Sequence, residues 1–226
     1  MAVDLLKFGS CTVSNVVDKS TVSVKSFWDG TPCVIALLRR FGCAFCRLHA
    51  LELSRFQSAF QAKGVRLIGI GHDTEGVEEF REGQFFSGEL YLDEKKETYA
   101  ALGCGSVGLV PGMFSLVQSA GRNLVRETKG KNVVGNLKGD GWQTGGLVVV
   151  DKDGSLLYSF KQTKVTDNPD YVKIKELFNL KEEDLAPLKG NQPKAVSITE
   201  NERTNFRRHA SSIISTGLQP RVERRR

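Results

Sequence analysis

The sequence predicts an α/β domain in which a mixed β-sheet carries helices on both faces. Two short, continuous apolar runs, residues 33–38 and 65–71, are typical of strands buried on both sides. Segments with helical spacing follow each run, and this alternation favours parallel strands joined by helices. A late pair of apolar runs flanks Lys152-Asp153-Gly154, which predicts an antiparallel hairpin and makes the sheet mixed.

The remaining elements can be placed in chain order. Loose alternation over residues 10–25 predicts an N-terminal β-hairpin that turns near Asp18-Lys19. One long helix is expected over residues 43–63, because apolar side chains recur on one face until Gly64. Further helices are expected at 75–82, 95–102 and 171–180, with another allowed between Phe114 and Val125, and further strands at 89–93, 146–151 and 155–161. This order matches a thioredoxin-like fold with an N-terminal hairpin extension.

Composition indicates one domain and a tail. The chain has 226 residues and a net charge of +6, and its apolar patterning ends near residue 185. We expect a folded domain over residues 1–185 and a basic, disordered tail over 186–226, solvated rather than bound to nucleic acid. The sequence contains no stretch of about 18 apolar residues, so no transmembrane helix is expected. The N-terminus does not resemble a secretory signal. A cytoplasmic location is therefore expected.

Cysteine usage agrees with a reducing compartment. The five cysteines form no evident disulfide framework; they are Cys11, Cys33, Cys43, Cys46 and Cys104. Only Cys43 and Cys46 are close in sequence. A close pair in such a setting is more often catalytic or metal-binding than structural.

The pair Cys43-Ala44-Phe45-Cys46 lies where the first buried strand gives way to the longest helix. Unpaired amides and the dipole at a helix start favour an anion, such as a thiolate. A free thiol has a pKa of about 8.5, which helix starts or nearby cations lower to about 3.5–7.5. The flanking arginines, Arg39, Arg40 and Arg47, are candidates to add to this effect. The pattern predicts a redox-active dithiol.

Other interpretations of these residues stay open. The pair could be half of a zinc site, although the remaining cysteines and histidines are scattered, or two inert buried thiols. Cys104 could act as a third, resolving thiol, with an ordinary loop residue as the favoured alternative. Cys11 and Cys33 fit core positions. His49 fits a buried, hydrogen-bonded residue better than a general base.

The segment Leu38-Arg39-Arg40-Phe41-Gly42-Cys43-Ala44-Phe45-Cys46-Arg47 resembles the peroxiredoxin-like 2 family, of the AhpC/TSA type. Further matches follow in family order across residues 30–165: Gly64-Val65-Arg66-Leu67, Gly88-Glu89-Leu90-Tyr91-Leu92-Asp93, Gly135-Asn136-Leu137, Gly139-Asp140 and Gln143-Thr144-Gly145-Gly146-Leu147. The resemblance does not extend to the tail.

The resemblance implies a thioredoxin-like oxidoreductase that binds no cofactor itself and takes electrons from thioredoxin, and ultimately from NADPH. One family member reduces the endoperoxide bridge of prostaglandin H2, or of its ethanolamide, to the F-type diol, which implies antioxidant or lipid-metabolic chemistry. Carried over, Cys43 attacks a peroxide oxygen and Cys46 resolves the adduct as a disulfide. Which sulfur attacks first is a hypothesis.

Two departures from better-known relatives concern the site. The Pro-x-x-x-Thr-x-x-Cys motif of peroxiredoxins is missing, and Thr144 precedes the late strand where thioredoxins carry a cis-proline; its backbone is expected to line the site. An apolar groove for a lipid-like substrate could be formed by Phe41, Phe45, Val107, Leu109, Val110, Met113 and Phe114, with ordinary core positions as the favoured alternative for these residues. Alternative functions are a general hydrogen peroxide peroxidase and a redox-sensing protein whose tail binds a partner.

Overall fold

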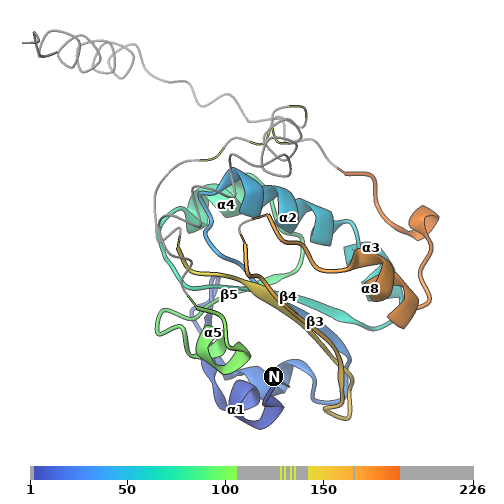
Figure 1. Ribbon diagram of the computed structural model, residues 1–226, viewed down its shortest axis with the longest axis horizontal. Coiled ribbons are helices and arrows are strands. Elements are labelled where there is room, and N and C mark those ends of the chain that lie inside the picture. Colours follow the sequence, from blue (N-terminus) through green and yellow to red (C-terminus); the bar gives the residue numbers. More distant parts are fainter. Residues whose placement is uncertain are drawn as a thin grey trace, which may run out of the picture. The chain divides into compact units, whose positions relative to one another are not determined.

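A computed structural model of the protein describes residues 3–105, 128, 130, 133, 135, 142–164 and 166–188 (Figure 1). All of them fall in the first of two units, residues 1–192 and 193–226. The described elements are α1 (Leu5–Ser10), β1 (Thr12–Asn15), β2 (Thr21–Ser23), the 3-10 helix η1 (Val24–Phe27), β3 (Cys33–Leu37), α2 (Ala44–Ser54), α3 (Gln57–Ala62), β4 (Arg66–Gly71), α4 (Val77–Glu82), β5 (Glu89–Leu92), α5 (Glu97–Leu102), β6 (Gly146–Val150), β7 (Leu156–Lys161), α8 (Tyr171–Leu177) and the 3-10 helix η2 (Glu182–Asp184).

The strands form one seven-stranded sheet in the order β2-β1-β5-β4-β3-β6-β7. Strands β3, β4 and β5 are parallel, whereas β6 runs antiparallel to β3 and β7 antiparallel to β6. Ala36 in the central strand pairs with Gly69 on one side and Leu147 on the other. The N-terminal hairpin extends the sheet because β1 pairs antiparallel with β5. The predicted mixed sheet is confirmed.

Both faces of the sheet are covered, because side chains of β3 alternate between two cores. Val34 and Ala36 pack in the core that α2, α3, α4 and α8 cover. Cys33, Ile35 and Leu37 face the opposite core, with α1 and α5. Figure 1 shows these helix groups on opposite sides of the central strands. A strand buried on both faces explains why residues 33–38 are continuously apolar.

The prediction of a single helix over residues 43–63 is wrong. The structure has two helices there, α2 and α3, which are separated by Arg55 and Phe56. The hydroxyl of Ser54 bonds back to the Ala50 carbonyl at 2.7 Å, a contact that bends helices. The Arg55 carbonyl accepts a bond from the Ala186 amide at 3.0 Å. Neither Pro nor Gly marks the break, so apolar periodicity could not reveal it.

The short helix α1 was not predicted. Asp4 caps it by accepting a hydrogen bond from the Lys7 amide at 3.0 Å. Six residues are too few for periodicity to stand out, and the helix is stabilised mainly by the burial of Phe8.

Two predicted features lie outside the described residues: the helix between 114 and 125, and the tail from residue 189 on. The chain stays on the domain as far as Leu188, which packs against the core. The tail's order and its boundary stay predictions. Among the residues that the structure describes, none of the helices has the length and apolarity needed to span a membrane.

Tyr99 on α5 holds together the ends of the two central parallel strands. Its side chain is fully buried, and its hydroxyl donates toward the carbonyls of Leu38, at 2.6 Å, and Ile70, at 2.8 Å. This contact fixes the backbone immediately before Arg39.

We predict that Tyr99→Phe lowers the free energy of unfolding by about 1–3 kcal/mol, because buried carbonyls lose a donor. Urea denaturation measures this change. Tyr158→Phe is the matched control, since its hydroxyl accepts an exposed bond from the Asp170 amide and its loss should cost within about 0.5 kcal/mol. Equal effects of the two changes would refute the bridging role of Tyr99.

Candidate active site

Cys43 and Cys46 lie at the start of α2, at the carboxyl edge of the central strands. Cys43 is the N-cap residue, with extended backbone (φ −78°, ψ 125°), and Cys46 falls in the first turn. Both are free thiols; Cys43 is partly exposed, and Cys46 is 7% exposed. The predicted position of the pair between a buried strand and a helix is confirmed.

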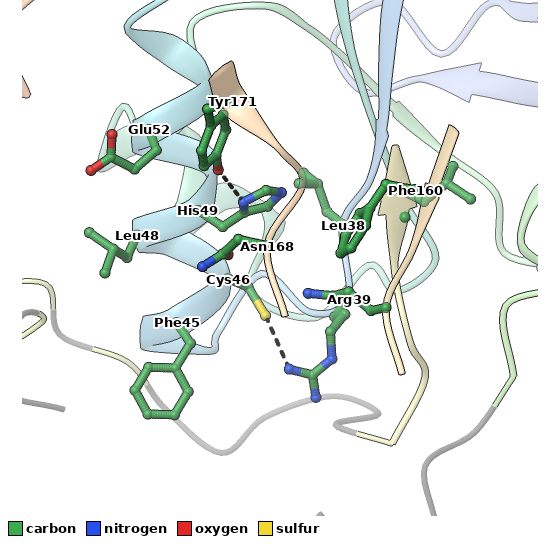
Figure 2. A pocket seen from close by; sticks show the side chains of 13 residues that line it. Leu38, Arg39, Phe45, Cys46, Leu48, His49, Glu52, Phe160, Asn168 and Tyr171 are labelled. Atoms are coloured by element: carbon green, nitrogen blue, oxygen red, sulfur yellow. Dashed lines mark hydrogen bonds between the residues drawn. The ribbon is translucent and has the colours of Figure 1, made fainter. Parts of the chain in front are cut away.

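Arg39 is a buried cation beside the pair. Its side chain is only 6% exposed, and its Nε donates to the Gln143 carbonyl at 3.1 Å. Its Nη1 lies 3.9 Å from Cys46 Sγ, the contact drawn in Figure 2. Residue 143 comes from the segment before β6, so Arg39 ties that segment to the start of α2.

The two thiols hold one proton between them. The pKa of Cys43 is lowered to about 5, chiefly by a hydrogen bond from the Cys46 thiol. Burial opposes this shift, while Arg39 and the amides of Cys46 and Phe45 support it. The pKa of Cys46 is raised well above its usual value by the same hydrogen bond and by burial. Cys43 is therefore a thiolate at neutral pH, and Cys46 keeps its proton.

The other two predicted arginines act differently from Arg39. Arg47 is buried, and its Nε donates to the Phe41 carbonyl at 2.8 Å. Its guanidinium lies 4.6 Å from the centre of the Phe85 ring and 3.4 Å from a Glu79 oxygen, so it braces α2 against α4. Arg40 contributes through its backbone amide, which hydrogen-bonds the Cys46 sulfur.

Thr144, expected from the sequence to line the site, is anchored to Gly105 by three hydrogen bonds. Its hydroxyl bonds both the carbonyl and the amide of Gly105, at 2.9 and 3.1 Å, and its own amide donates to the same carbonyl. Next to it, a Cβ on Gly145 would lie 2.3 Å from the Leu37 carbonyl oxygen. Only glycine allows this segment to approach the end of β3 so closely.

Gly135 is a site residue whose place the sequence did not reveal. A Cβ there would lie 2.4 Å from the Ala44 amide nitrogen and 2.9 Å from the Gly42 carbonyl oxygen. The backbone at residue 135 therefore passes directly against the start of α2. The motif Gly135-Asn136-Leu137 was the available signal; Asn136 and Leu137 lie outside the described residues.

The other cysteines are buried thiols. Cys104 donates to the Gly145 carbonyl at 3.3 Å, and burial raises its pKa to about 11. Burial likewise raises the pKa of Cys33 to about 12 and the pKa of Cys11. These surroundings match the core positions predicted for Cys11 and Cys33. Among the described residues, no group of three or more histidine, cysteine or acidic side chains is placed to hold a metal ion.

A pocket of about 320 Å³ opens beside Cys46 (Figure 2). Its walls come from the end of β3, from α2, from β6 and β7 and from the segment that leads into α8. Phe45 lines this pocket as predicted, but Phe41 is a core residue packed on Phe80, with ring centres 4.9 Å apart. The other predicted groove residues, 107, 109, 110, 113 and 114, lie outside the described residues.

His49 is hydrogen-bonded, as expected. Its Nδ1 lies 2.6 Å from the hydroxyl of Tyr171 on α8. Burial lowers the pKa of His49 to about 4, so the ring is neutral at physiological pH.

Sequence comparison identifies relatives along most of the chain. The family model for the AhpC/TSA antioxidant enzyme matches residues 52–164, a segment that begins after the cysteine pair. The prostamide/prostaglandin F synthase of Homo sapiens is 39% identical over 166 residues, which cover 73% of this chain and 84% of the synthase. The synthase of Danio rerio is 33% identical over 174 residues, or 76% of this chain and 87% of the synthase.

Solved structures support the fold. A Xanthomonas campestris bacterioferritin comigratory protein, described for its alkyl peroxide reduction activity, superposes with a TM-score of 0.53 at 13% identity, covering 80% of this chain and 98% of its own. Peroxiredoxin Q of the same organism gives 0.51 at 13% identity, covering 77% and 94%. At these identities the likeness concerns the fold alone, and it confirms the predicted thioredoxin-like architecture.

We predict that the alkylation rate of Cys43 by iodoacetamide is close to its maximum at pH 7 and half-maximal near pH 5, because the thiolate is the reacting form. Peptide mass spectrometry between pH 4 and 9 measures the rate.

Two variants at Cys46 test the cause of this low pKa. Cys46→Ala removes the hydrogen bond and should move the midpoint toward that of a free thiol, about 8.5. Cys46→Ser keeps a donor and should move it less. Identical midpoints in the two variants would show that the bond from residue 46 does not set the Cys43 pKa.

Proposed function

The chain belongs to the AhpC/TSA antioxidant enzyme family, within its peroxiredoxin-like 2 group, and on that premise we propose that it reduces an organic endoperoxide with a Cys43/Cys46 dithiol. The substrate would be prostaglandin H2 or prostamide H2 and the product the F-type diol, as the names of its relatives suggest. The observation that carries the proposal is a pair of free thiols at the start of a helix, in which the pKa of Cys43 is lowered and the pKa of Cys46 is raised by the hydrogen bond between them.

In the first step, the Cys43 thiolate attacks one oxygen of the O–O bond. A sulfur–oxygen bond forms, the O–O bond breaks, and the second oxygen leaves as an alkoxide. The Cys46 thiol, which keeps its proton until this moment, is the nearest acid to that alkoxide. Proton transfer gives the first hydroxyl of the product.

In the second step, the Cys46 thiolate attacks the Cys43 sulfur. A disulfide forms, and the remaining oxygen leaves as an alkoxide that takes a proton from water. The proton given up when Cys43 first ionised balances this one, so two thiols supply two electrons and two protons. Arg39, 3.9 Å from Cys46 Sγ, stabilises the Cys46 thiolate while it exists.

A dithiol reductant then restores the enzyme. The thioredoxin-like, peroxiredoxin-like fold suits exchange with thioredoxin, whose reductase takes electrons from NADPH. This chain would bind neither NADPH nor another cofactor. A cytoplasmic location would supply the reductant.

We expect NADPH-dependent turnover of prostaglandin H2 in the presence of thioredoxin and its reductase, with formation of the F-type diol. Cys43→Ser should reduce this turnover by at least about 1,000-fold, because the nucleophile is lost. NADPH absorbance and mass spectrometry of the product measure both quantities, with hydrogen peroxide offered in parallel. Cys11→Ser is the matched control, since a serine there keeps the hydrogen bond to the Lys7 carbonyl.

Trapping with substrate assigns the attacking sulfur. Cys46→Ser should still form the first covalent adduct on Cys43, and loss of that adduct would reverse the two roles. Turnover on hydrogen peroxide alone would make the protein a general thiol peroxidase. Absence of Cys43-dependent turnover on either peroxide would favour a redox-sensing role.

A further inference from the structure

The pocket beside Cys46 is not needed for the chemistry of two sulfurs. Its volume is about 320 Å³, whereas one water molecule takes up about 30 Å³ in the liquid. Hydrogen peroxide is only slightly larger than water and needs no such space. Pockets that bind organic small molecules begin at about 300 Å³.

The pocket walls combine apolar surface with a few polar groups. Leu38 and Phe160 face Cys46 and His49 across the opening (Figure 2). The exposed Asn168 lines the same pocket. This composition suits a ligand that is apolar along its length and carries isolated oxygen atoms.

His49 offers the pocket a hydrogen-bonding group. Its Nδ1 is engaged by Tyr171, and in the described part of the chain its second nitrogen, Nε2, has no hydrogen-bond partner. Figure 2 shows the ring directed from α2 toward Leu38 and Phe160. If the Tyr171 hydroxyl donates to Nδ1, Nε2 is a donor; if it accepts, Nε2 is an acceptor. Either form can bind a ligand oxygen or hydroxyl.

The charged residues that line the pocket further restrict the class of ligand that it can bind. The only ionisable residues on the described walls besides Cys46 and the neutral His49–Tyr171 pair are Arg39 and Glu52. Glu52 lies 3.2 Å from its partner Arg55, and in Figure 2 it points away from the Cys46 side of α2. The cation Arg39 therefore lies at the Cys46 end of the pocket, and the carboxylate on these walls, Glu52, is already paired with Arg55, which disfavours a positively charged ligand.

We propose that this pocket is the subsite for the non-reacting part of the organic peroxide, with His49 as the residue that binds a polar group of the substrate. The subsite rests on the proposed function and makes the enzyme selective for a bulky endoperoxide over hydrogen peroxide. A side chain of thioredoxin is the competing occupant. The hydrogen-bonded pair His49–Tyr171 in the pocket wall favours the small molecule, because it offers a specific hydrogen bond to a polar atom of the ligand.

The experiment compares kcat/KM for prostaglandin H2 and for hydrogen peroxide, together with the KM for thioredoxin. His49→Phe keeps an aromatic ring but removes Nε2. Asn168→Trp fills the pocket from an exposed position and keeps the test valid if the first variant folds poorly. In each variant the ratio of the two kcat/KM values, endoperoxide over hydrogen peroxide, should fall about tenfold. Val172→Ala, an exposed residue next to Tyr171 on α8, is the control and should leave the ratio unchanged.

A binding measurement separates this inference from the proposed reaction. Calorimetry with the F-type diol should show binding to the reduced wild-type protein and about tenfold weaker binding to both variants. Diol binding that depends on the pocket would sustain the subsite even if the endoperoxide were not turned over. An unchanged ratio with unchanged diol binding would overturn it, and a raised KM for thioredoxin alone would assign the pocket to the reductant.

Discussion

The site depends on the short connection, residues 38–43, that joins the fully buried strand β3 to α2. Along this connection the backbone must leave a sheet that is packed on both faces and still place the two cysteine sulfurs where a substrate can reach them. Tyr99 holds the Leu38 carbonyl from the face opposite α2, and Arg39 reaches back to the Gln143 carbonyl. The connection is thus held by contacts with two distant parts of the chain. At the end of this connection the two sulfurs are hydrogen-bonded free thiols.

The hydrogen bond between the two cysteines gives them unequal roles in the proposed reaction. A buried thiolate is costly, and the pair holds only one, on the partly exposed Cys43 at the helix start. The charge moves to Cys46 only after Cys46 gives up its proton, and Arg39 is then beside it. The proposed reaction would therefore keep one negative charge next to one fixed positive charge in both of its thiolate states, which limits the electrostatic cost of transferring it.

Sequence alone predicted the sheet, its helices and the location of the cysteine pair, because these depend on local patterns: buried runs, helical spacing and the strand-to-helix boundary. It could not distinguish the three arginines, since only tertiary contacts direct Arg47 toward Phe85 and Arg39 toward Cys46. The break of the long helix escaped prediction for the same reason: Ala186 meets Arg55 across more than a hundred residues of sequence. Gly135 was visible as a motif, but its approach to Ala44 is a property of the fold.

The spacing along α2 links the chemistry to the choice of substrate. Cys43, Cys46 and His49 follow one another at intervals of three, and an α-helix rises about 1.5 Å per residue. A ligand that touches both Cys43 and His49 must therefore extend about 9 Å along the helix. Hydrogen peroxide is far too short for that contact, whereas a chain-bearing endoperoxide can place its O–O bond at Cys43 and a polar group at His49. The same helix would then activate the nucleophile at its start and bind the rest of the substrate through His49 in its second turn.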